Sequence, residues 1–238
     1  GTAVDDQSYS KLTVKNCIIR NFAKGVYVNW GGAEAPSNAT IINNEFYSIS
    51  TQPIAILNGG NYANITNNSI YNTPYSTYNV ITLQSASYAT IRQNTIINSS
   101  TSALYFLDGS NYNLVDNNTI INVSYGFQGA TTGSNFTNNR INSSTYGFYL
   151  SSGSYNLFVS NNLQGNTWDF YSAGSGTGNI VTNLTTQQNL VSFTSQDIAL
   201  KGLTTSGVPG DPSNYKNISK YLNITNNSAS SWIYLNVS

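Results

Sequence analysis

The chain has 238 residues, nine basic and nine acidic, with a formal net charge of zero and only 8% charged residues. This composition argues against nucleic-acid binding, which needs Lys and Arg to displace counterions from phosphates, and no apolar run approaches the length of a membrane span. Charge normally keeps a cytoplasmic surface soluble, whereas this chain is rich in Asn, Ser, Thr and Tyr. We therefore expect an extracellular or cell-surface protein without a cofactor.

A short phrase recurs along residues 12–185. Clear copies read Ala-Asn-Ile-Thr-Asn-Asn-Ser-Ile at 63–70 and Asn-Leu-Val-Asp-Asn-Asn-Thr-Ile at 113–120. Its last Asn serves as a reference position, and the reference residues are Cys17, Asn44, Asn68, Asn94, Asn118, Asn139, Asn162 and Asn183. Self-similarity at such a period of 21 to 27 residues is typical of a solenoid.

The apolar positions of the phrase predict strands. An apolar residue stands three before each reference position: Val14, Ile41, Ile65, Ile91, Val115, Phe136, Val159 and Ile180. Another stands two after it in six copies: Ile19, Phe46, Ile70, Ile96, Ile120 and Ile141. Alternation with polar residues favours strand over helix. A second strand follows about ten residues on, at Val26–Val28, Ile54–Leu57, Val80–Leu83, Leu104–Leu107 and Phe148–Leu150. The sequence predicts an all-β, parallel β-helix of about eight coils.

The reference Asn has a structural explanation. Asn tolerates the left-handed backbone needed at a sharp bend between strands, and inward-turned amides can bond one another from coil to coil as a ladder. Cys17 occupies the same position, so we expect a small buried residue there rather than a nucleophile or ligand.

The segments outside the coils take three forms. Residues 1–10 are expected to cap the first coil, because an open end exposes unpaired backbone. The excursions 29–37 and 72–78 are the early long loops. After residue 185 the repeat is lost, and four strands are predicted at Leu190–Phe193, Ile198–Leu203, Lys220–Thr225 and Trp232–Val237.

These last strands predict a second unit. We divide the chain into a β-helix at 1–185 and a small β-sandwich-like unit or cap at 186–238. The final strand can complete a neighbouring subunit's sheet by strand addition, through the residues Trp232, Ile233, Tyr234 and Leu235.

The acidic residues of the coils give little support to catalysis. Asp116 and Arg92 share a column on adjacent coils and are interpreted as an ion pair, while Asp108 is interpreted as a turn residue. Glycosidases and lyases of polysaccharides use clustered carboxylates. No two carboxylates fall in register on neighbouring coils, so we do not favour an enzyme.

Aromatic residues offer a binding alternative. Outward rings can stack on sugars or on another protein, and the candidates are Tyr27, Trp30, Tyr105, Tyr149 and Tyr171. A further set, Tyr62, Tyr88 and Tyr112, recurs six residues before the reference position. The alternative is that these rings only cover the strand surface.

Asn-x-Ser/Thr sequons are numerous and predict N-glycosylation where the Asn faces outward. The candidates are Asn38, Asn64, Asn98, Asn122, Asn135, Asn142, Asn217, Asn223 and Asn226. Asn183 is a sequon at the inward reference position and is expected to be bare.

The repeat resembles the right-handed parallel β-helices of the NosD-type family and the pectate-lyase-like superfamily. The resemblance implies the right-handed coil. The copper-delivery role of NosD-type proteins is not carried over, because copper prefers imidazole, thiolate or thioether ligands and the chain offers only Cys17. The tail Tyr215-Lys-Asn-Ile-Ser-Lys-Tyr-Leu resembles segments of large archaeal surface proteins.

Together these observations predict a structural protein of the cell surface, N-glycosylated and self-associating, as an envelope component, stalk or filament subunit. The alternative is a carbohydrate-binding adhesin whose partner is a surface polysaccharide; a polysaccharide lyase or glycosidase ranks third.

Overall fold

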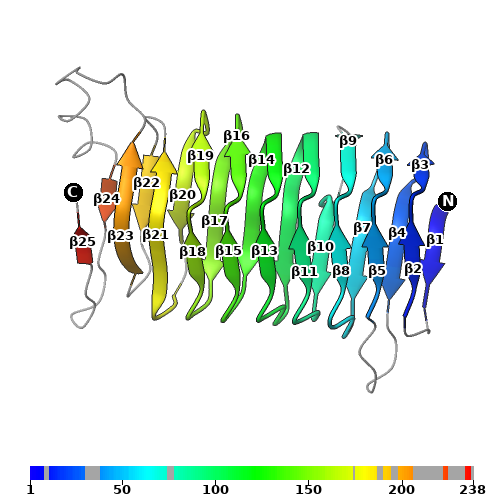
Figure 1. The fold of residues 1–238 in the computed structure, drawn as a ribbon, viewed down its shortest axis with the longest axis horizontal. Helices are drawn as coiled ribbons and strands as arrows, with labels where there is room; N and C mark the ends of the chain where they lie inside the picture. The colour runs from blue at the N-terminus through cyan, green and yellow to red at the C-terminus, as the bar shows by residue number, and fades with distance from the viewer. Residues whose placement is uncertain are drawn as a thin grey trace.

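The computed structural model describes residues 1–7, 11–29, 38–73, 78–173, 175–186, 190–193, 198–205, 222–224 and 234–236, and for the last four ranges it describes the strands alone. Every paired strand runs parallel to its neighbours, and the strands stack along one long axis (Figure 1). Each coil contributes to three columns of strands, so the chain forms a parallel β-helix, as predicted.

The first column contains the strands that carry the repeated phrase. It is made of β2 (Thr13–Lys15), β5 (Thr40–Ile42), β8 (Asn64–Thr66), β11 (Thr90–Arg92), β13 (Leu114–Asp116), β15 (Asn135–Thr137), β18 (Leu157–Val159), β21 (Asn179–Thr186), β23 (Ile198–Thr205) and β25 (Tyr234–Asn236).

The second column follows the reference position. It is made of β3 (Ile18–Arg20), β6 (Glu45–Tyr47), β9 (Ser69–Thr73), the first halves of β12 (Thr95–Leu107) and β14 (Thr119–Ala130), β16 (Arg140–Asn142), β19 (Asn162–Gln164) and the end of β21.

The third column completes each coil. It is made of β1 (Thr2–Asp6), β4 (Lys24–Asn29), β7 (Gln52–Leu57), β10 (Ile81–Gln84), the second halves of β12 and β14, β17 (Tyr146–Ser152), β20 (Trp168–Ser172), β22 (Leu190–Phe193) and β24 (Leu222–Ile224).

The core lies between the three columns. The inward residues of the first column are at most 6% exposed, and they are Val14, Ile41, Ile65, Ile91, Val115, Phe136, Phe158 and Val181. Toward the later coils aliphatic residues give way to phenylalanines whose ring centroids lie 4.6–6.2 Å apart: Phe106, Phe127, Phe136, Phe148, Phe158 and Phe170. Burial of these side chains, at roughly 25 cal/mol per Å² of apolar surface, drives the stacking of the coils.

The predicted register is wrong by one residue in the last two copies. Phe158 and Val181 face the core, whereas Val159 is half-buried and Ile180 is 36% exposed. In a strand, a shift of one residue exchanges the two faces. The register of the first of these copies was ambiguous in the sequence. It has two adjacent asparagines, at 161 and 162, and two adjacent apolar residues, at 158 and 159.

The left-handed backbone falls one residue earlier than predicted. The φ angles of Asn43, Asn67, Asn117 and Asn138 lie between 53° and 59°, and each of these residues precedes a reference Asn. Gln93 and Ser160 hold the same position on other coils, at 55° and 53°. In each of these repeats, therefore, one residue adopts the left-handed backbone of the bend, and the residue after it contributes its side chain to the asparagine ladder.

Cys17 is exposed, not buried as predicted. We expected residues 1–10 to cap the first coil. Among the described strands, however, β1 pairs only with β4 and therefore covers the third column alone. The first and second columns begin with β2 and β3, respectively. Each of these strands therefore pairs with a described strand on one side only. At this rung Ile18 is 71% exposed.

The strands after residue 185 extend the same stack. Strands β22, β23, β24 and β25 pair in parallel with β20, β21, β22 and β23, respectively. In the described part of the chain they are added rungs, rather than the sandwich-like layer that was predicted. The division into two domains at residue 185 stays a prediction.

Candidate functional site

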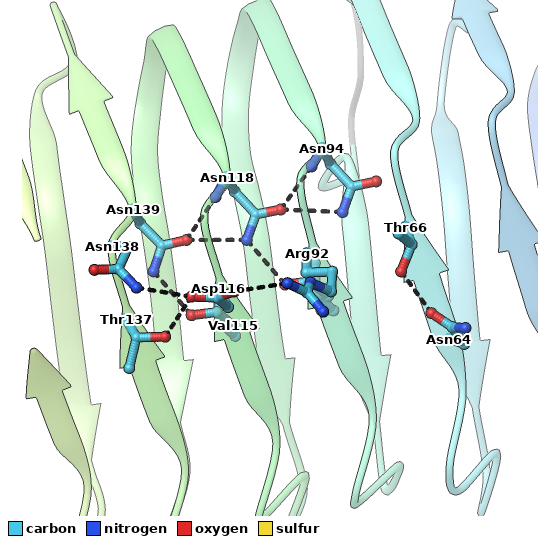
Figure 2. Close-up of polar contacts among 11 residues, drawn as sticks. Asn64, Thr66, Arg92, Asn94, Val115, Asp116, Asn118, Thr137, Asn138 and Asn139 are labelled. Carbon is cyan, nitrogen blue, oxygen red and sulfur yellow. Dashed lines mark hydrogen bonds and ion pairs between the residues drawn. The ribbon is translucent and has the colours of Figure 1, made fainter.

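The interior asparagines form a hydrogen-bonded ladder whose role is structural. Asn118 donates from its backbone N and its Nδ2 to Asn139 Oδ1 at 3.0 and 2.9 Å, and Nδ2 also donates to Ile91 O (Figure 2). The same pattern joins Asn44, Asn68, Asn94, Asn118, Asn139 and Asn161. Each amide is almost fully buried and hydrogen-bonded through both its Oδ1 and its Nδ2, so it stabilises the stack and offers nothing to a ligand.

The ladder continues to Asn161, not to the predicted Asn162. At the next coil Leu184 takes the inward position, and Asn183 is exposed with φ 51°. Asn183 was predicted to face inward, and this expectation is wrong for the same reason as the register.

A second buried ladder was not predicted. Asn113, Ser134, Asn156 and Asn179 bond the backbone N of the preceding coil through their side-chain oxygens. The signal was present in the sequence as an Asn or Ser five residues before the inward position of the coil, which is Asn118, Asn139, Asn161 or Leu184. Ala occupies the equivalent position before Asn44, Asn68 and Asn94.

The predicted ion pair of Arg92 and Asp116 is present, with Nη2 and Oδ2 3.5 Å apart (Figure 2). The other carboxylate oxygen accepts bonds from Thr137 Oγ1 at 2.6 Å and Asn138 Nδ2 at 3.1 Å. All groups that surround Asp116 are therefore satisfied surface partners. Asp108 lies in a turn, as predicted, with φ 47°.

The acids of the coils are spread over different positions. Glu45 is on β6, Asp116 on β13, and Asp169 is fully buried on β20, where Asn166 Nδ2 donates to it at 2.9 Å. Within the described ranges, no group of three or more His, Cys, Asp or Glu side chains is placed to hold a metal ion.

Five aromatic residues form one cluster on the outer face of the third column. In one row Tyr125, Tyr146 and Trp168 stack with centroids 4.9 and 6.4 Å apart, and in the next row Tyr149 stacks on Tyr171 at 5.3 Å. The two rows meet edge to face, at 5.3–5.7 Å. We call these five residues the aromatic cluster.

The cluster contains two of the predicted stacking residues, Tyr149 and Tyr171. Tyr105 and Tyr27 share their column, but Gln128, Thr82 and Ala55 interrupt it. Tyr27 instead lies under Lys24 Nζ, 3.7 Å from its ring centroid. Trp30 lies outside the described residues.

Sequence reasoning missed Tyr125, Tyr146 and Trp168. Each stands two residues before a buried Phe, in Tyr-Gly-Phe at 125–127 and 146–148 and Trp-Asp-Phe at 168–170. This spacing from a buried Phe was the signal that the sequence offered. The three residues lie at a corner of the coil, however, where inward and outward side chains do not simply alternate.

Burial raises the pKa of the Tyr146 and Tyr149 phenols. The neighbouring hydroxyls of the cluster raise both pKa values further, through Tyr125 and Tyr171 for each and through Tyr149 for Tyr146. The Tyr146 and Tyr149 phenols are therefore uncharged at neutral pH.

A groove of about 480 Å³ is lined by residues from four coils. Its lining is made of small, uncharged residues: Ser99, Ser100, Asn122, Val123, Ser124, Ser143, Ser144, Thr145, Gly165 and Thr167. Ser124, Thr145 and Thr167 directly precede Tyr125, Tyr146 and Trp168 in the chain. We call this feature the hydroxyl groove.

A second aromatic row lies at another corner of the coil. Tyr62, Tyr88 and Tyr112 stack with centroids 5.1 and 5.3 Å apart, and each is about half exposed. Each has a positive φ, and Tyr112 covers Gly133, where a Cβ would lie 2.6 Å from its ring. The Tyr112 ring therefore covers the backbone of the next coil.

The sequons differ in their surroundings. Asn38, Asn98, Asn122 and Asn135 are exposed, while Asn64 and Asn142 are half-buried. Asn122 Nδ2 donates to Asn98 Oδ1 at 2.9 Å. Asn217 and Asn226, with the side chain of Asn223, lie outside the described residues.

The proposed subunit-contact strand is partly described. β25, which contains Tyr234 and Leu235, pairs with β23, so one edge of this strand is used within the chain. This pairing weakens the expectation of strand addition. Trp232 and Ile233 lie outside the described residues.

The three parallel columns of strands and the buried ladder define a parallel β-helix solenoid. A comparison with protein families agrees: residues 1–163 match the family described as the right handed beta helix region. The chain belongs to this family, and its coil is right-handed. No curated protein matches the sequence. None of the described residues forms a helix long and apolar enough to cross a membrane.

Proposed function

We propose that this protein is a rigid, non-catalytic β-helix of the cell surface, which acts as a spacer or envelope component and carries N-glycans. The observation that supports it most is the continuous buried ladder from Asn44 to Asn161. From the coil of Cys17 to the coil of Asn161, each coil is tied to the next by buried amides, which gives a stiff rod.

The outer surface supports the extracellular placement. It consists of hydroxyl, amide and phenol groups, and the ion pair of Arg92 and Asp116 is shared between adjacent coils. A surface of this kind relies on covalent glycans or on bulk polysaccharide for solubility rather than on charge. The separation of Glu45, Asp116 and Asp169 supports a role without acid–base catalysis.

Immunogold labelling of intact cells of the source organism tests the placement. We expect label on unpermeabilised cells; label that appears only after permeabilisation refutes the proposal. Self-association through the ends of the rod is tested by sedimentation at high concentration, where a monodisperse monomer contradicts it.

A carbohydrate-binding function is the second candidate. It is favoured by one observation, the aromatic cluster, because rings on an outer face can stack on sugars.

A further inference from the structure

Tyr62, Tyr88 and Tyr112 occupy the same corner on three successive coils. The backbone N of each residue donates to a carbonyl of the next coil at 2.9–3.0 Å, and the three φ angles lie between 56° and 60°. Their side chains therefore leave the backbone in the same direction. The rings stack with centroids 5.1 and 5.3 Å apart and with planes inclined by 12–13°. We call these three residues the tyrosine row.

The tyrosine row ends at Tyr112. On the next coil Gly133 holds this corner, and its N donates to Ser154 O at 2.9 Å, so Tyr155 lies two coils beyond Tyr112. Tyr155 has the same backbone as the row, with φ 56°, but it stacks on no other ring among the described residues. It is 68% exposed, whereas the members of the row are 48–54% exposed. The corner therefore holds three stacked tyrosines and one isolated tyrosine.

Neighbouring phenols can be joined by oxidation. A one-electron oxidant removes an electron and the hydroxyl proton from a phenol, and the resulting radical carries part of its unpaired spin on the ring carbons beside the hydroxyl, Cε1 and Cε2. Two such radicals form a C–C bond between these carbons, and the hydrogen of each bonded carbon then moves to the phenol oxygen. With hydrogen peroxide as oxidant, two phenols and one peroxide give one dityrosine and two molecules of water.

The geometry of the tyrosine row favours this coupling within one molecule. Radicals on separate molecules must meet by diffusion, whereas the row holds each ring against the next at a high effective concentration. About half of each side chain is exposed, so an oxidant can reach it. In the aromatic cluster, by contrast, Tyr149 and Tyr171 meet Tyr146 edge to face and restrict the tilt that a bond between stacked rings requires.

We propose that the tyrosine row is a site of oxidative cross-linking, at which Tyr88 forms a dityrosine bond with Tyr62 or Tyr112 and ties two adjacent coils covalently. The oxidant is hydrogen peroxide, which a separate peroxidase activates. The bond stabilises the coils because a cross-link restricts the unfolded chain, as a disulfide does. The proposal goes beyond the rod function, since a rod without the bond remains a spacer.

Treatment of the purified chain with hydrogen peroxide and a haem peroxidase, at low protein concentration, tests the proposal. We expect dityrosine fluorescence in the monomer fraction, a loss of two hydrogen atoms from the monomer mass for each bond, and linked proteolytic peptides that join Tyr88 to Tyr62 or Tyr112. Tyr88→Phe keeps the central ring of the row but removes its phenol. Because Tyr62 and Tyr112 are not neighbours, both linked peptides should disappear in this variant.

Tyr155→Phe is the matched control, because it removes a phenol at the same corner that is more exposed but has no stacked neighbour in the described structure. Its yield of linked peptides should equal that of the unchanged chain. Each variant loses only a surface hydroxyl, and circular dichroism checks its fold. In addition, the oxidised monomer of the unchanged chain should unfold at a higher urea concentration than the oxidised monomer of Tyr88→Phe.

Three outcomes overturn the proposal. Dityrosine forms only between molecules and never within the monomer, or the linked peptides of the monomer contain tyrosines of the aromatic cluster alone, or Tyr155→Phe lowers the yield as much as Tyr88→Phe does. The cell-surface labelling described above is independent of all these results.

Discussion

Asn118 Nδ2 donates to Asn139 Oδ1 at 2.9 Å, while Asn94 donates to Asn118 Oδ1 from both its backbone N and its Nδ2. The Asn118 side chain therefore bonds groups on the coil before it and on the coil after it. We expect Asn118→Ala to lower the free energy of unfolding by about 3 kcal/mol, because it leaves buried donors of Asn94 and the carbonyl of Ile91 unpaired.

Urea unfolding followed by circular dichroism measures this loss. Asn135→Ala is the control, since Asn135 is exposed and its side chain has no hydrogen-bond partner in the described structure; its effect should stay within about 0.5 kcal/mol. Equal effects of the two substitutions would contradict the structural role of the ladder.

The ion pair of Arg92 and Asp116 should contribute little. Arg92 is 47% exposed at its side chain, so Arg92→Gln is expected to cost at most about 1 kcal/mol. Asp116→Ala should cost more, because Thr137 and Asn138 also lose their acceptor. Thermal unfolding at low and high salt tests this, since salt should remove the Arg92 effect but not the whole Asp116 effect.

The aromatic cluster predicts a loss of stability in alkali. The pKa values of Tyr146 and Tyr149 are raised above the unfolded value of 10.0, so the folded state holds these protons more tightly. The stabilisation is complete below pH 10 and is lost as the pH rises through the folded-state pKa values. Tyr146→Phe should reduce the alkaline loss, as measured by thermal unfolding across this range. An unchanged pH profile in this variant would show that the phenol does not contribute.

Glycosylation should discriminate among the sequons. Asn135 is exposed and free, whereas Asn98 and Asn122 bond each other on adjacent coils, about 4.8 Å apart. Two glycans at that distance would collide, so we expect Asn135 to be occupied and no single molecule to carry glycans on both Asn98 and Asn122. Glycopeptide mass spectrometry of native protein decides this, and a doubly modified peptide spanning both residues contradicts it.

Much of the fold could be predicted from local sequence. Val115 and Ile120 alternate with polar residues around Asn118, and this pattern identifies strands wherever it occurs. Its recurrence at 21 to 27 residues predicts the solenoid, and the pairing of Arg92 with Asp116 followed from the same alignment of columns.

The failures occur where neighbours along the chain are chemically alike. Asn161 and Asn162 fit the ladder equally well by type, and so do Phe158 and Val159 in the core. The choice between them is made by packing: the larger Phe158 ring fills the interior against Phe136 and Phe148, and Asn161 then follows in register. The alternation of apolar and polar residues along the chain does not predict the packing of Phe158 against Phe136 and Phe148.

The sequence alone determined the parallel β-helix and its charge-poor surface, because the apolar period and the composition are properties of the chain read in order. Only the tertiary structure decided that Tyr125, Tyr146 and Trp168 stack in one row against Tyr149 and Tyr171. Coils of unequal length must be stacked before it is known which residue lies above which, and that register is set by the packing of the whole core rather than by any single repeat.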